Sequence, residues 1–303
     1  DALFESLLAQ SPLAEFTFIL TEMRDTAKLE LSPKEEALIS ALQVDGYEAW
    51  GQYYNLLISD LKVEVEVDGQ AQTLSIGQAN NLSSHPDVNV RKAAFEALEQ
   101  VFTEREEFFA KVLNHLGGFR LATYEKRGWD NVLDEPLRIN RMQQKTLDAM
   151  WQAICNNKQP FIDFLQKKAK LFGANKMDWY NFDAPITESV STMPYSEGAQ
   201  FILTQFEKFG PELANFARTA FEDGWIEAEN RDNKRPGGFC TGLPMSEQSR
   251  IFMTYSGTMS NISTLAHELG HAFHSYALRP VHVLNRSYAM NVAETASTFA
   301  EMI

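Results

Sequence analysis

The stretch TLAHELGHAFHS at residues 264–275 decides how this chain folds and what chemistry it carries. Within it, His267 and His271 are four residues apart, so on an α-helix their side chains lie on one face, about 6 Å apart along the axis. Two imidazole nitrogens at that spacing can bind one zinc ion. Glu268 follows the first histidine, where its carboxylate can reach a water molecule on the metal and act as general base. We therefore predict a zinc-dependent hydrolase with one Zn²⁺ per chain.

A catalytic zinc ion usually has three protein ligands and one position left for water, so a third ligand is needed. The candidates are His274, Glu294 and Glu301. His274 lies about 10.5 Å along the axis from His267, too far for three histidines of an unbroken helix to bind one ion. The two glutamates lie on a following helix, and spacing and small neighbours favour Glu294. Glu301 and His274 are then expected to support a ligand through hydrogen bonds.

A structural explanation of these histidines is weaker. With 6 histidines in 303 residues, an HExxH pattern arises by chance on the order of once in a hundred such sequences. Two core histidines and a core glutamate would all need hydrogen-bond partners. A purely structural zinc site usually has four protein ligands, often cysteines, and has no use for a base. A non-catalytic zinc-binding protein is therefore the less favoured alternative.

Composition narrows the class of protein further. The hydrophobic content of 44% and charged content of 22% are typical of a globular protein. A net charge of −14 argues against nucleic acid, whose phosphates are met by Lys and Arg. No stretch approaches the ~20 apolar residues of a membrane-spanning helix. Two distant cysteines make no disulfide framework, which suggests the reducing cytoplasm. The oligomeric state cannot be read from these features.

The ends of the chain suggest a larger polypeptide. The sequence starts at Asp1 without the basic and apolar leader of a signal peptide. It stops at Ile303 inside a segment of helical spacing, with no Gly or Pro as a stop signal. We expect the catalytic domain to continue beyond this point.

Helical periodicity dominates the chain and predicts a mainly α protein in two lobes. Alternating valines followed by Asp68 and Gly69 predict a β-hairpin over residues 62–76. We expect an N-terminal helical lobe with this hairpin at 1–115, and the N-terminal portion of a catalytic domain at 116–303. The predicted helices lie near 33–42, 46–61, 86–115 (stopped by Gly117 and Gly118), 141–157, 159–172, 196–208 and 211–223.

The region before the metal motif predicts a small sheet. Residues 250–255 alternate as a short strand, and Asn261 or Ser263 is expected to cap the metal helix, which should end near residue 280. As an edge strand, this segment would pair with an extended peptide. An ordinary internal strand is the alternative. The residues expected to face the substrate are Phe252, Met253, Thr254 and Tyr255.

The chain resembles the oligoendopeptidase F branch of the thimet-oligopeptidase-like zinc peptidases. The resemblance is carried by LAHELGHAFH at 265–274 and by AETAS at 293–297, with Glu301 seven residues after Glu294. It is supported by WIE at 225–227, KRPGGF at 234–239 and WYNFDAPI at 179–186, where Asn181 replaces a usual Asp. The resemblance implies a zincin-like fold, with His267, His271 and Glu294 as ligands and Glu268 as base. The family's carbonyl-assisting Tyr and His residues lie in a part that this chain does not contain.

These features favour an endopeptidase that cuts short oligopeptides in the cytoplasm. A carboxypeptidase or dipeptidyl carboxypeptidase on a related scaffold is the alternative within enzymes. It would need a cationic anchor for the free C-terminus of its substrate, for which Arg235 and Arg250 are candidates.

Overall fold

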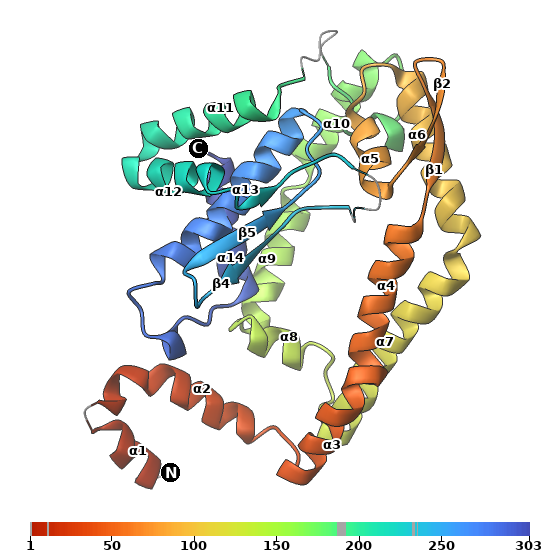
Figure 1. Cartoon of the computed structure of the whole chain (residues 1–303). Coiled ribbons are helices and arrows are strands. Elements are labelled where there is room, and N and C mark those ends of the chain that lie inside the picture. The colour runs from red at the N-terminus through yellow and green to blue at the C-terminus, as the bar shows by residue number, and fades with distance from the viewer. Residues whose placement is uncertain (1, 11, 187–191, 232–233, 235) are drawn as a thin grey trace.

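The computed structural model describes residues 2–10, 12–186, 192–231, 234 and 236–303 (Figure 1). Helices account for 66% of the described residues, twice the usual share of a globular protein, and the predicted mainly α class is confirmed. No helix in the described part combines the length and the hydrophobicity needed to cross a bilayer. The first half contains α1 (Ala2–Leu8), α2 (Thr17–Ala27), α3 (Pro33–Gln43), α4 (Ala49–Asp60), β1 (Val63–Val67), β2 (Gln70–Leu74), α5 (Ile76–Asn81), α6 (Val88–Glu104) and α7 (Glu106–Arg127). The second half contains α8 (Asp134–Ile139), α9 (Gln144–Asn156), α10 (Gln159–Leu171), α11 (Tyr195–Phe209), α12 (Pro211–Glu222), β3 (Ile226–Glu227), β4 (Phe239–Leu243), β5 (Gln248–Phe252), α13 (Met259–Ala277) and α14 (Met290–Glu301).

The predicted hairpin is present as the antiparallel pair β1 and β2. Its turn residues Asp68 and Gly69 have φ of 51° and 77°, as the tight type I′ turn requires. The three valines of β1 are all buried, and they pack against α6 beside the hairpin (Figure 1). Alternation in the sequence therefore marks the buried face of the strand.

The predicted helix stop at Gly117 and Gly118 is wrong. A helix break occurs earlier, at Arg105, and α7 then runs through both glycines to Gly128, whose φ of 69° ends it. Glycine in a helix costs about 1 kcal/mol, and packing of α7 along α4 (Figure 1) offsets this cost. The division between residues 115 and 116 falls within this continuous helix and stays a prediction.

The small sheet beside α13 has the order β3-β5-β4. The segment predicted at 250–255 is shifted, since β5 ends at Phe252, and it is not an edge. It pairs in parallel with β3 and antiparallel with β4. The two-residue strand β3 has too little pattern to be recognised in the sequence, so the second neighbour of β5 was missed. The two edges of this sheet are therefore β4 and the two-residue β3, one on either side of β5.

The helix with the histidines lies at the centre of the largest apolar core. Leu265 and Leu269 of α13 are fully buried among residues of α11, α12 and β5. The helix begins earlier than predicted, because Thr258 rather than Asn261 or Ser263 is the N-cap, and its hydroxyl accepts the N–H of Asn261 at 3.2 Å. After α13 the chain folds back, and α14 packs along α13 more extensively than any other pair of elements.

Candidate metal centre

Helix α13 places the two histidines of the HExxH pattern on one face, as their spacing predicts. Their Nε2 atoms lie 3.1 Å apart, and both side chains are partly exposed. Burial lowers the pKa of His271, with the neighbouring Glu294 acting against it. The imidazole is therefore neutral near pH 7, which is the form that binds a metal.

Helix α14 reaches these histidines because α13 has a glycine at the crossing. A Cβ atom on Gly270 would lie 2.8 Å from Ala300 Cβ and 2.9 Å from the Ala296 carbonyl oxygen, so a larger residue would push α14 away. At this separation Glu294 Oε2 lies 3.3 Å from His267 Nε2 and 3.6 Å from His271 Nε2. One atom from each of the three side chains lies within 4.8 Å of the others. Three donors thus converge on one point.

Three further carboxylate contacts hold this arrangement in place. His267 Nδ1 contacts Glu301 Oε1, and Glu301 Oε2 accepts a hydrogen bond from the Ser263 hydroxyl at 3.2 Å. The opposite ring nitrogen of His267 is thereby left to face Glu294. Glu294 Oε2 accepts from the buried Ser297 hydroxyl at 2.9 Å. Ser263 and Ser297 were not predicted, although Ser263 lies four residues before His267, on the same helical face.

Glu268 is only 5% exposed, and its carboxyl lies against a glycine of the segment before β4. A Cβ atom on Gly238 would be 2.8 Å from Glu268 Oε1, so a side chain at that position would displace the carboxyl. Glu268 Oε2 has no hydrogen-bond partner among the described residues. The pKa of Glu268 is raised to about 7, chiefly by burial, with His267 acting against the rise and Glu294 contributing to it. The group can therefore both accept and release a proton near neutral pH.

His274 is not part of the convergent group. Its ring packs against that of Tyr288 in a tilted arrangement, with centroids 4.3 Å apart, and burial lowers its pKa. Its Nδ1 atom has no partner in the described part of the chain. Among the described residues, Glu301 contacts a ring nitrogen of one convergent histidine, whereas no hydrogen bond or ion pair joins His274 to the group.

The residues expected along a substrate strand lie in or next to β5. Phe252 pairs with β4 and β3 at once. Met253, Thr254 and Tyr255 are buried, and the Tyr255 hydroxyl donates to the Met193 carbonyl at 3.0 Å. Met253 and Tyr255 donate their backbone N–H groups to the Glu227 and Ala228 carbonyls, and β5 itself, up to Phe252, has a neighbour on either side. The edge strand β4 has exposed residues from Thr241 to Leu243 instead.

Comparison with known proteins finds matches to peptidases, in agreement with this geometry. The model of peptidase family M3 matches residues 81–303, and the N-terminal model named oligopeptidase F matches residues 1–62. An oligoendopeptidase F homolog of Lactococcus lactis is 27% identical over 278 residues, covering 90% of this chain and 46% of the relative. Oligopeptidase PepF of Bacillus subtilis is 24% identical, covering 100% of this chain and 46% of the relative. The chain spans about half the length of these relatives.

Solved structures share the fold. PZ peptidase A with a bound inhibitor superposes with a TM-score of 0.79 at 20% identity, covering 99% of this chain and 54% of the other. Oligoendopeptidase F from Enterococcus faecium superposes with a TM-score of 0.63 at 18% identity, covering 100% and 48%. Since the family model matches most of the chain, including both metal-centre helices, the chain belongs to peptidase family M3, with an N-terminal region of the oligopeptidase F type.

Proposed function

We propose that this chain carries the metal centre of a zinc-dependent endopeptidase that hydrolyses short oligopeptides. The observation that supports this most is the convergence of His267 Nε2, His271 Nε2 and Glu294 Oε2 within 4.8 Å of one another. Two imidazoles and one carboxylate are a donor set of catalytic zinc sites. Directly beside it lies the buried Glu268, whose Oε2 atom has no hydrogen-bond partner among the described residues.

The three residues suit zinc both in the donor atoms they offer and in the way their side chains are held. Neutral imidazoles and a carboxylate are the forms that bind Zn²⁺, and Glu301 fixes the ring of His267 through its second nitrogen. Bound there, one zinc ion would supply Lewis-acid chemistry, polarising the peptide carbonyl and lowering the pKa of water.

Glu268 carries the proton in this mechanism. Its unpartnered Oε2 accepts a proton from the attacking water, and the same carboxyl then delivers that proton to the leaving amine. A pKa near 7 suits both steps, because the group changes protonation state easily at neutral pH. Gly238 keeps space open for this carboxyl.

The exposed edge of β4 is the better place for an extended peptide to pair, since β5 has neighbours on both sides. The alternative, a carboxypeptidase, needs a cationic anchor. Arg250 is engaged locally, donating to the Ser249 carbonyl at 2.7 Å and to Gln248 Oε1 at 2.8 Å, and Arg235 lies outside the described residues. These contacts, and relatives named oligoendopeptidase, favour an endopeptidase. Two free cysteines favour the cytoplasm as its location.

Metal analysis and product mapping test this function. The full-length protein should bind about one zinc ion and cut a decapeptide blocked at both ends at an internal bond. Removal of the metal with a chelator should abolish cleavage, and zinc should restore it. Cleavage only of peptides with a free C-terminus would favour the carboxypeptidase, and zinc binding without cleavage would favour a non-catalytic protein.

A further inference from the structure

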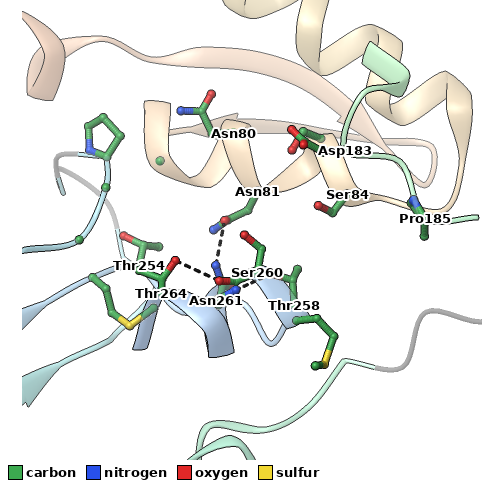
Figure 2. A pocket seen from close by; sticks show the side chains of 17 residues that line it. Asn80, Asn81, Ser84, Asp183, Pro185, Thr254, Thr258, Ser260, Asn261 and Thr264 are labelled. Atoms are coloured by element: carbon green, nitrogen blue, oxygen red, sulfur yellow. Dashed lines mark hydrogen bonds between the residues drawn. The ribbon is translucent and has the colours of Figure 1, made fainter. Parts of the chain in front are cut away.

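A cavity of about 620 Å³ lies between the first lobe and the N-terminal end of α13 (Figure 2). The upper wall is formed by α5 and the short 3₁₀ helix Leu82–Ser84, and the lower wall by the first turn of α13. Gly238 lines the cavity, and a Cβ atom at this position would lie 2.8 Å from Glu268 Oε1. The cavity therefore adjoins the candidate metal centre without containing any of its convergent residues.

Asn81 and Asn261 face each other across this cavity (Figure 2). The Asn261 side chain is fixed, because its Oδ1 accepts from the Ser256 N–H at 2.7 Å and from the Ser256 hydroxyl at 2.8 Å. Its Nδ2 donates to Asn81 Oδ1 at 3.4 Å. This hydrogen bond to Oδ1 fixes the orientation of the Asn81 amide. The Nδ2 donor of Asn81 is buried without a partner among the described residues.

Thr254 contributes a second such group from the opposite lobe. It lines the same cavity, is 8% exposed, and its Oγ1 has no partner in the described part of the chain. A buried hydroxyl or amide without a hydrogen bond is costly, and a native structure rarely keeps one without a reason. Two unpartnered groups, one from each lobe, thus border a cavity that is large enough to hold part of a ligand.

The chemistry of the lining indicates the kind of ligand. Around Asn81 and Thr254 the cavity presents the amide of Asn80 and the hydroxyls of several Ser and Thr residues. Asp183 is the one charged residue among the described lining residues, which include no cation. Neutral donors and acceptors of this kind pair with neutral amide groups, and an anionic ligand would meet no counter-charge among these described lining residues.

We propose that this cavity is a peptide subsite that binds the substrate main chain beside the scissile bond. Asn81 Nδ2 donates to a peptide carbonyl, and Thr254 Oγ1 bonds to a peptide group from the other side. The substrate is then held by both lobes at once, while its side chains remain free to vary. The inference rests on the proposed peptidase function.

A substrate series with two variants tests the subsite. Decapeptides blocked at both ends are shortened one residue at a time from either end, and kcat/KM is measured for the zinc-loaded full-length protein. Asn81→Asp removes the donor but keeps the oxygen that Asn261 binds. Losing one hydrogen bond should lower kcat/KM about 3- to 10-fold for peptides that reach the cavity. The loss should vanish once the residue in the cavity is removed.

Thr254→Val provides an independent measurement with the same expected dependence on peptide length. Because its hydroxyl has no partner in the described structure, this variant should unfold at a temperature no lower than the wild type. The matched controls are Asn114→Asp on α7 and Thr219→Val on α12, at exposed positions outside the cavity. These variants should cleave every peptide with the kcat/KM of the wild type.

The outcomes separate the subsite from the function on which it rests. An equal loss for every peptide length, or no loss in either variant, would overturn the subsite while leaving the peptidase in place. If the wild type cleaved none of the blocked peptides, the proposed function would fail and the subsite with it.

Discussion

Glu268 lies in an environment that opposes its own ionisation. It is nearly inaccessible to solvent, Glu294 adds negative charge, and His267 compensates only in part. Glu268 is also the proposed base, so the burial that raises its pKa for catalysis also destabilises the folded protein when the group is ionised. Other residues hold the convergent group in place: Glu301 contacts His267 and Ser297 donates a hydrogen bond to Glu294, while Ser263 in turn donates to Glu301.

Replacing Glu268 should therefore stabilise the metal-free protein and abolish catalysis. Its pKa rises from 4.5 to about 7 on folding, so the unfolded chain releases the proton first. The contribution of Glu268 to the free energy of unfolding is fully present below pH 4.5. It decreases by on the order of 3 kcal/mol as the pH rises towards 7. Glu268→Gln should raise the unfolding temperature in chelator at pH 8, with little change at pH 5.

The zinc-loaded Glu268→Gln protein should retain the metal and lose about 10²- to 10⁴-fold of its hydrolysis rate, because the base is absent. Thermal unfolding at the two pH values and a peptide assay measure both effects. Destabilisation at pH 8, or retention of more than a tenth of the activity, would contradict the role of Glu268.

Glu301 is expected to act through His267. Glu301→Gln keeps the shape of the side chain but removes the charge that contacts His267 Nδ1. Residues that orient a metal-binding histidine typically contribute about 10- to 100-fold to metal affinity. Competition with a chromophoric chelator should show that loss for Glu301→Gln and none for Glu207→Gln on α11. Equal zinc affinity in both variants would show that Glu301 has no such role.

At the scale of elements, the candidate metal centre depends on how closely α13 and α14 approach. Gly270 faces α14 at Ala296, Ser297 and Ala300, with no room for a Cβ atom. The crossing brings Glu294 to the histidines. The small residues of AETAS therefore serve the packing of the helices as well as the chemistry.

Two glycine substitutions should have opposite effects. Gly270→Ala should destabilise the protein by about 1–3 kcal/mol, as overpacking does, and weaken zinc binding because Glu294 moves away. Gly118→Ala is the control, since a Cβ atom at Gly118 meets nothing within 4 Å. It should stabilise α7 by about 0.5–1 kcal/mol. Thermal unfolding and zinc titration measure both; a neutral Gly270→Ala would mean that α14 can shift without harm.

For the whole molecule, segments distant in the sequence restrict access to α13. Helix α5 lies over the N-terminal end of α13, and a hydrogen bond from Asn261 to Asn81 joins the two helices (Figure 2). An extended peptide can enter such a space, whereas a loop of a folded protein must be long to reach the same point. The net charge of −14 weakly disfavours anionic peptides, an effect that salt screens.

Full-length enzyme should therefore cut peptides of roughly 5–20 residues and leave folded proteins intact. A blocked decapeptide and a folded protein with loose surface loops, incubated in parallel, decide the matter. Comparable cleavage rates for the two would mean that access is open. A chemically unfolded sample of the same protein controls for the presence of cleavable bonds, and it should be cut.

The sequence by itself determined what depends on neighbours along the chain. The i, i+4 spacing places His267 and His271 on one helical face, and the alternating valines with Asp68 and Gly69 specify the hairpin. Both follow from backbone geometry alone. The approximate positions of most helices follow from the 3.6-residue period in the same way.

Only the tertiary structure decided what depends on contacts distant in sequence. The helix through Gly117 and Gly118 is held by α4, and β5 is internal because the two-residue β3 lies beside it. Glu294 and Glu301 were both candidate ligands from spacing. The crossing at Gly270 gives them different positions: Glu294 faces the Nε2 atoms of both histidines, whereas Glu301 contacts Nδ1 of His267. The Asn81 donor is similarly visible only once α5 lies over α13. Local patterns carry no information on these approaches, because packing between distant segments sets them.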